Sequence, residues 1–148
     1  MFSNVLFVCV GNICRSPMAA ALLRHRVAGR LAVNSAGVQA HNGAHMDVEA
    51  RAVLKQNRIK GGDHRACQVT PELLHWADLV LLMEHEQLHR VVRLAPEVRG
   101  KAFLIGKWQN DLQIADPYRR PKNAFQQTYT HLSRCVDDWM PYLSIEDQ

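Results

Sequence analysis

A cysteine and an arginine, Cys9 and Arg15, stand at the two ends of a short segment whose residue types point to chemistry. The apolar run 5–8 before them is typical of a buried strand, and Ser16 and Pro17 after them predict a helix with Ser16 as N-cap and Pro17 as its first residue. Backbone N–H groups of such a loop can turn inward. Together with the positive end of the helix dipole, they favour a bound anion. The segment therefore predicts an anion site with a nucleophile at its floor, because the same field favours a cysteine thiolate.

The anion that suits this loop best is a phosphate group. The planar guanidinium of Arg15 can hold two phosphate oxygens at once, which a lysine cannot do. Cys9, as a thiolate, can attack phosphorus in line while the loop holds the other oxygens. We expect the phosphate to be bound by Val10, Gly11, Asn12, Ile13, Cys14, Arg15 and Ser16.

Other loop types fit the segment less well. A Walker loop ends in Gly-Lys-Ser or Gly-Lys-Thr and a dinucleotide loop has three spaced glycines, whereas this loop has only Gly11. A metal site is disfavoured because Cys9 and Cys14 lack a second cysteine pair, so we expect no metal and no other cofactor. In the remaining alternative, Cys9 is a small buried residue at a strand end and Arg15 is a solvated residue at a helix start.

At these residues the chain resembles the low-molecular-weight protein tyrosine phosphatases. Their signature is a cysteine, five residues, an arginine and a serine or threonine, with an Asp-Pro pair far downstream. The similarity runs nearly end to end through Cys9, Arg15, Ser16, Asn34-Ser35-Ala36-Gly37, His64, Gln68-Val69-Thr70, Asp78 to Met83 and Asp116-Pro117-Tyr118. Residues 95–101 and 115–119, with Trp108, are most similar to the bacterial branch associated with exopolysaccharide and capsule production.

The resemblance implies a protein tyrosine phosphatase that hydrolyses phosphotyrosine through a phosphocysteine intermediate. Cys9 would be the nucleophile, Arg15 the phosphate ligand and Asp116 the general acid. A tyrosyl oxygen leaves poorly as an anion, so a carboxylic acid must protonate it, and the resulting carboxylate can then activate water. By itself, an Asp-Pro pair is typical of a loop turn. In the branch that the chain resembles, the substrate is an autophosphorylating membrane tyrosine kinase, so the implied partner is such an autokinase.

Further residues are assigned by the same resemblance. Asn12, Ser35 and His64 match positions that hold the loop through hydrogen bonds, although His64 also fits a surface loop imidazole. We expect Ser16 to give its hydroxyl to the Cys9 thiolate. One histidine and one cysteine depart from the family pattern. His41 stands where many members carry an aromatic or large apolar residue, and Cys67 stands where arginine is common.

The pocket rim and a redox role complete the predicted site. His41 and Tyr118 are expected at the rim, and Ile13 and Tyr118 are expected to form walls for the substrate ring, unless Tyr118 only packs the loop. Cys14 is expected to trap an oxidised Cys9 as a disulfide. The alternative is that Cys14 is a small side chain that fills the back of the loop.

Two other functions use the same fold or the same loop. Arsenate reductases of this architecture need a pair of relay cysteines after the third strand, and residues 84–102 contain none. A phosphotyrosine-binding module without catalysis should have lost Cys9, Arg15 or Asp116, and all three are present.

The elements that must position these residues alternate between strand and helix. Apolar runs and helical spacing predict strands over 5–8, 31–34, 79–83 and 102–105, and helices over 17–28, 47–57, 71–75, 86–94 and 122–142. In the second helix, Val48, Ala52 and Val53 are expected to face the core. The alternation predicts an α/β fold, a three-layer domain with a four-stranded parallel sheet and helices on both faces. Ligands of such folds lie beyond the carboxyl ends of the strands, where the Cys9 loop belongs.

Composition agrees with a single domain over 1–148. The 148 residues, 47% of them hydrophobic, are enough for a sizeable core. Apolar runs are far shorter than the roughly 20 residues that span a bilayer, so we expect no membrane insertion. The formal net charge of +4 is scattered, which favours anionic substrates over nucleic acid. Four cysteines, one of them a candidate nucleophile, favour the cytoplasm.

Overall fold

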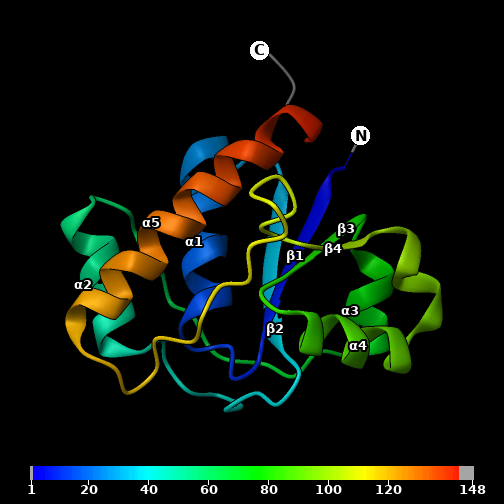
Figure 1. Cartoon of the computed structure of the whole chain (residues 1–148), viewed down its shortest axis with the longest axis horizontal. Coiled ribbons are helices and arrows are strands. Elements are labelled where there is room, and N and C mark those ends of the chain that lie inside the picture. Colours follow the sequence, from blue (N-terminus) through cyan, green and yellow to red (C-terminus); the bar gives the residue numbers. More distant parts are fainter. Residues whose placement is uncertain (1, 144–148) are drawn as a thin grey trace.

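Four parallel strands form the centre of the computed structural model, which describes residues 2–143 (Figure 1). The predicted 1–148 domain therefore has its extreme ends outside the described residues. The sheet has the order β2-β1-β3-β4. β1 pairs with both β2 and β3, and its apolar residues are buried in the two cores that lie on opposite faces of the sheet. The strands are β1 (Asn4–Cys9), β2 (Ala32–Gly37), β3 (Leu79–Leu82) and β4 (Ala102–Leu104).

Helices cover both faces of this sheet. The elements are α1 (Arg15–Val27), α2 (Val48–Gln56), α3 (Pro71–Trp76), α4 (His85–Leu94) and α5 (Lys122–Trp139), with the short 3-10 helices η1 (Pro96–Gly100) and η2 (Met140–Tyr142). In Figure 1, α1, α2 and α5 lie on one side of the strands, and α3 and α4 lie on the other. Phe7 and Leu81 belong to the first of the two cores, whereas Leu6 and Val80 belong to the second, as the alternation of side chains along a strand requires. The predicted three-layer α/β fold is confirmed.

The parallel arrangement brings the carboxyl ends of the strands to one edge of the sheet. The loop after β1 lies there, beside the end of β2. A Cβ atom on Gly37 would stand 2.4 Å from the carbonyl oxygen of Val10, so only glycine allows this close approach. The last residue of β2 therefore helps to set the path of the loop that follows Cys9.

The start of α1 differs from the prediction. The helix begins at Arg15, and Cys14 occupies the N-cap position without a side-chain capping bond. Ser16 is therefore not the N-cap, because its hydroxyl faces Cys9 instead of the free amides of the helix. Pro17 is tolerated within the first turn, where an N–H group would have no partner inside the helix.

The inner face of α2 also differs at one position. Val48 is 77% exposed, whereas Ala50, Val53 and Leu54 are buried. Val48 is the first helical residue after the N-cap Asp47, and the face that packs on α1 and α5 begins two residues later. The spacing of apolar residues did not settle which of them face the core, and packing against the neighbouring helices did. No helix within residues 2–143 is long and apolar enough to cross a membrane.

Candidate active site

A cavity of about 180 Å³ lies at the carboxyl edge of the sheet. It brings together the predicted nucleophile, phosphate loop, acid and rim. Its lining residues are Cys9, Val10, Gly11, Asn12, Ile13, Cys14, Arg15, His41, Asp116 and Tyr118. A larger hollow of about 640 Å³ on the outer side of α4 has no thiol and no carboxylate in its lining. The smaller cavity, unlike this hollow, holds a thiol, a carboxylate and an arginine together.

Loop carbonyl groups point away from the cavity, because each is bonded to a neighbouring segment. Across a trans peptide, the N–H of each residue points opposite to the carbonyl of the residue before it. The N–H groups of residues 10–14 are thereby turned to the side on which an anion would sit, as in other backbone nests. The outward contacts are Cys9 O with Val38 N, Val10 O with Gln39 N, Gly11 O with His41 N, Asn12 O with His64 Nε2 and Ile13 O with Asp47 N, at 2.6–3.0 Å.

Asn12 connects this loop with neighbouring segments through its backbone conformation and its side chain. Its φ of 60° lies in the left-handed region, which asparagine tolerates better than most side chains. Its buried amide donates to Ser16 Oγ at 2.7 Å and to Ser35 Oγ at 3.0 Å, and its Oδ1 accepts the N–H of Cys67 at 2.9 Å. Asn12, Ser35 and His64, predicted as loop supports, are thus in direct contact through Asn12.

His64 is half-buried rather than a free surface imidazole. Its Nε2 lies 2.6 Å from the carbonyl oxygen of Asn12. Burial lowers the pKa of His64, against the opposing effect of the Asn12 carbonyl, and the charges of Arg24 and Arg51 lower it further. The neutral ring is therefore favoured. Cys67 supports the loop through its backbone N–H, so this contact does not depend on which side chain stands there.

The predicted nucleophile, Cys9, lies against a hydroxyl group. Cys9 Sγ is 2.9 Å from Ser16 Oγ, as the sequence predicts. Ser16 Oγ accepts a hydrogen bond from the Asn12 amide, so its own proton can be donated to Cys9 sulfur, which is nearer than the other acceptor, the Ala36 carbonyl at 3.4 Å. A hydrogen bond to the charged form stabilises a thiolate.

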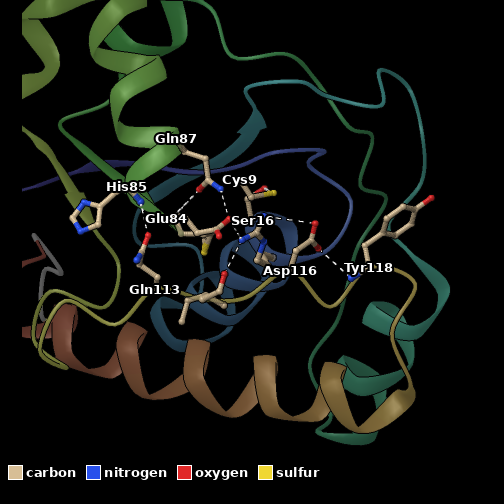
Figure 2. Close-up of polar contacts among 11 residues, drawn as sticks. Cys9, Ser16, Glu84, His85, Gln87, Gln113, Asp116 and Tyr118 are labelled. Atoms are coloured by element: carbon tan, nitrogen blue, oxygen red, sulfur yellow. Dashed lines mark hydrogen bonds and ion pairs between the residues drawn. The ribbon is translucent and has the colours of Figure 1, made fainter.

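Arg15 is buried, with 2% of its side chain exposed, which excludes the solvated helix-start alternative. Its Nη1 donates to Glu84 Oε1 at 2.6 Å and to the carbonyl oxygen of Ile114 at 2.7 Å (Figure 2). Its Nη2 lies 3.8 Å from Asp116 Oδ2. The arginine thus connects the loop with the segment that carries the acid.

The outer part of the cavity is formed by the predicted acid, Asp116, and two rings. Asp116 is 47% exposed at its side chain, and its Oδ1 accepts the N–H of Tyr118 at 3.1 Å. The rings of His41 and Tyr118 meet edge to face, with centroids 5.9 Å apart, and Arg119 lies over the Tyr118 ring. Both predicted rim residues therefore line the cavity, and Tyr118 also packs its own loop.

Cys14 fills the back of the loop, with 3% of its surface exposed. Burial raises the pKa of the Cys14 thiol far above its usual range, and the charges of Asp47, Asp116 and Cys9 act in the same direction. The protonated thiol form of Cys14 is therefore favoured. Within residues 2–143, no group of three or more His, Cys, Asp or Glu side chains is arranged to hold a metal ion.

Sequence reasoning missed Glu84, Gln87 and Gln113. Glu84 accepts from Arg15, Gln87 donates to Glu84, and Gln113 accepts the backbone N–H of His85. No local spacing connects these residues with the Cys9 loop. The available signal was the position of Glu84 just beyond the end of the third predicted strand, at the edge where sites of such folds lie.

Comparison with known proteins gives one consistent result. Residues 4–148 match the family model "Low molecular weight phosphotyrosine protein phosphatase". The chain is 42% identical to the low molecular weight protein-tyrosine-phosphatase Wzb of Escherichia coli K12, over 99% of both chains. The structure of Wzb from Escherichia coli K30 with sulphate is similar at a TM-score of 0.91, with 39% identity over 96% of this chain and 99% of that one. The YwlE arginine phosphatase of Geobacillus stearothermophilus is similar at 0.88, with 36% identity over 94% and 91%.

Proposed function

Because this chain belongs to the low molecular weight phosphotyrosine protein phosphatase family, we propose that it hydrolyses phosphotyrosine through a phosphocysteine formed on Cys9. The observation that carries the proposal is that one cavity contains all three groups. The thiol of Cys9 lies at the floor of the loop, and the carboxyl group of Asp116 lies beside Arg15. A thiol nucleophile, a two-pronged cation and an exposed acid are the three groups that phosphomonoester cleavage requires.

In the first step, the Cys9 thiolate attacks phosphorus and the bond from phosphorus to the tyrosyl oxygen breaks. Asp116 gives its proton to the departing oxygen, so tyrosine leaves as a neutral phenol. Arg15 and the inward N–H groups of the loop bind the phosphoryl oxygens as charge moves through the transition state. Ser16 stabilises the thiolate before attack.

In the second step, the same groups act in the opposite sense. Asp116, now a carboxylate, takes a proton from water, and the water oxygen attacks the phosphorus of the phosphocysteine. The bond from phosphorus to sulfur breaks, inorganic phosphate is released and Cys9 returns as a thiolate. The 47% exposure of the Asp116 side chain allows the water to reach it.

The cavity walls favour an aromatic leaving group over a guanidinium. Ile13 and Tyr118 present apolar surface, and His41 adds a second ring at the rim. A phosphoarginine side chain would bring several N–H donors to a lining in which Asp116 is the one carboxylate. A phosphotyrosine ring has no N–H donors to satisfy there.

The physiological substrate follows from the resemblance to the exopolysaccharide and capsule branch. An autophosphorylating membrane tyrosine kinase is the proposed partner, and polysaccharide polymerisation and export is the proposed process. The cytoplasm is the proposed compartment, because the nucleophile must remain a free thiol, and Cys9, Cys14, Cys67 and Cys135 are all free.

The proposal is tested with matched peptides that carry phosphotyrosine or phosphoarginine, assayed for phosphate release with EDTA present. We expect turnover of the phosphotyrosine peptide in EDTA and trapping of a phosphorylated Cys9 by rapid acid quench and mass spectrometry. Turnover that depends on a metal ion, or faster release from phosphoarginine, would contradict the proposal. Glu86→Ala, at an exposed position on α4, provides the control variant.

A further inference from the structure

The guanidinium of Arg15 is divided between two tasks. Both protons of Nη1 are taken by Glu84 Oε1, at 2.6 Å, and by the Ile114 carbonyl, at 2.7 Å. A guanidinium has five N–H donors, so Nε and Nη2 keep three of them for a ligand. Those two nitrogens form the edge that binds two phosphoryl oxygens in parallel. The contact with Glu84 therefore decides which edge of Arg15 is turned to the cavity.

Glu84 is itself held in place by Gln87. The amide of Gln87 is fully buried, and its Oε1 accepts the N–H groups of Met83 and Glu84, both at 3.0 Å. Those two backbone donors set the orientation of the amide, so its Nε2 must face the other way. Nε2 donates to Glu84 Oε1 at 2.9 Å, the same oxygen that accepts from Arg15.

The first turn of α4 is in turn joined to the acid-bearing segment. The N–H of His85 donates to Gln113 Oε1 at 2.9 Å, and the N–H of Ile114 donates to the Met83 carbonyl at 2.9 Å. Figure 2 shows Glu84 and Gln87 on the α4 side of the site, next to the region of Cys9 and Ser16, whereas the His85 ring points away from it. The residues just after β3 thus connect α4, the acid-bearing segment and the arginine through hydrogen bonds.

We propose that Glu84 and Gln87 are positioning residues that orient the Arg15 guanidinium for the transferring phosphoryl group. This inference rests on the proposed phosphatase function. Glu84 places a negative charge beside the cation that must bind a dianion. It therefore cannot act by raising the affinity of the site for phosphate. Its contribution is the geometry of the fork, which matters most when the phosphoryl group becomes planar in the transition state.

The test compares the affinities of two inhibitors, inorganic phosphate and vanadate, in Glu84→Ala, Glu84→Gln and Gln87→Leu. Phosphate resembles the ground state, and vanadate can adopt the five-coordinate geometry of the transition state. In Glu84→Ala we expect kcat to fall roughly 10- to 100-fold and vanadate to bind correspondingly more weakly. Phosphate should bind at least as tightly as in the wild type, because a negative charge beside Arg15 is gone.

Glu84→Gln keeps an oxygen acceptor for Arg15 and should recover part of kcat. Gln87→Leu should lower kcat in the same way, since Glu84 loses its support. Glu86→Ala on the same helix turn is the matched control, and thermal unfolding of every variant identifies those that merely fold less well. In Glu84→Ala and Gln87→Leu, the loss of kcat should be equal for aryl phosphates with good and poor leaving groups, because Arg15 acts on the phosphoryl oxygens.

Equal weakening of phosphate and vanadate, or a kcat for Glu84→Ala like that of Glu86→Ala, overturns the inference while the phosphatase function stands. A loss that grows with the pKa of the leaving phenol also overturns it, since the effect would then pass through Asp116 instead of Arg15. An inactive wild type overturns the proposed function. In that case the ratio of vanadate to phosphate affinity still supports or refutes the orienting role of Glu84.

Discussion

Arg15 Nη2 and Asp116 Oδ2 lie 3.8 Å apart on the walls of one cavity. The distance is too long for a hydrogen bond, so Nη2 of the arginine and Oδ2 of the carboxyl group remain available to a substrate, whereas Oδ1 accepts the N–H of Tyr118. A phosphoryl group held by the loop would place its leaving oxygen near both. The relationship explains how residues from α1 and from the segment after β4 can act on one bond.

Replacement of Asp116 should affect the steps that move a proton. We expect Asp116→Ala to lower turnover of phosphotyrosine roughly 10²- to 10⁴-fold. The loss should be smaller for aryl phosphates whose phenol leaves readily as an anion. The measurement is the slope of log kcat against phenol pKa for wild type and variant. Equal losses for all leaving groups would argue against general acid catalysis by this residue.

Replacement of Cys9 should stop catalysis without removing the anion site. Cys9→Ser keeps the size of the side chain and the backbone nest, but an alcohol is not appreciably ionised there. We expect no measurable turnover, together with phosphate binding close to that of the wild type by calorimetry. Residual turnover of more than about a tenth of wild type would rule out Cys9 as the nucleophile.

Substrate selection should follow the depth of the cavity. Cys9 is 2% exposed at the loop floor, below the rim formed by His41 and Tyr118, so a long phosphotyrosine reaches it and a short phosphoserine does not. We expect kcat/KM to be at least roughly 100-fold lower for phosphoserine in matched peptides, a difference of about 2.7 kcal/mol in transition-state stabilisation. Comparable values for the two peptides would refute the argument from depth.

Peroxide inactivation should be reversible because of Cys14. Peroxide transfers one oxygen to the Cys9 thiolate, giving a sulfenic acid; attack by Cys14 sulfur then forms the disulfide and expels the oxygen as water.

We therefore expect oxidised wild type to recover with dithiothreitol and Cys14→Ser, with normal initial activity, to recover poorly. Mass spectrometry of the oxidised wild type should show a Cys9 to Cys14 linkage. Equal recovery of both proteins without that linkage would leave Cys14 as a packing residue only.

Folding stability should decline in acid because of His64. Burial lowers the pKa of the folded-state imidazole below its usual value of 6.5, so the unfolded chain binds the proton more readily. The contribution of neutral His64 is complete above pH 6.5 and is lost as the pH falls from there through the folded-state pKa. His64→Gln should remove this part of the pH dependence of folding stability.

The measurement is urea unfolding of wild type and His64→Gln at several pH values on both sides of 6.5, with His89→Gln as an exposed control. The stability difference between wild type and His64→Gln should shrink with falling pH. A difference that stays constant would show that His64 does not contribute through its neutral form.

Much of the chemistry was readable because it is local. Cys9, the loop and Arg15 are contiguous, so their spacing alone predicts a nucleophile beside an anion nest. Alternating strands and helices predicted the parallel sheet, because helices that connect parallel strands cover both faces of the sheet and bury its continuous apolar strands. Asp116 was assigned through a resemblance, since an Asp-Pro pair does not distinguish an acid from a turn.

Tertiary structure decided what depends on contacts between distant segments. Glu84 lies 69 residues from Arg15 in the sequence, and Ile114 lies 99 residues from it, so no periodicity relates them. Ser16 was expected both to cap the helix and to face Cys9; the helix begins one residue before it, and its hydroxyl contacts Cys9 and the Asn12 amide instead. Sequence spacing determines which groups a loop can present, whereas the orientation of a buried guanidinium is set by whichever acceptors the folded chain brings to it.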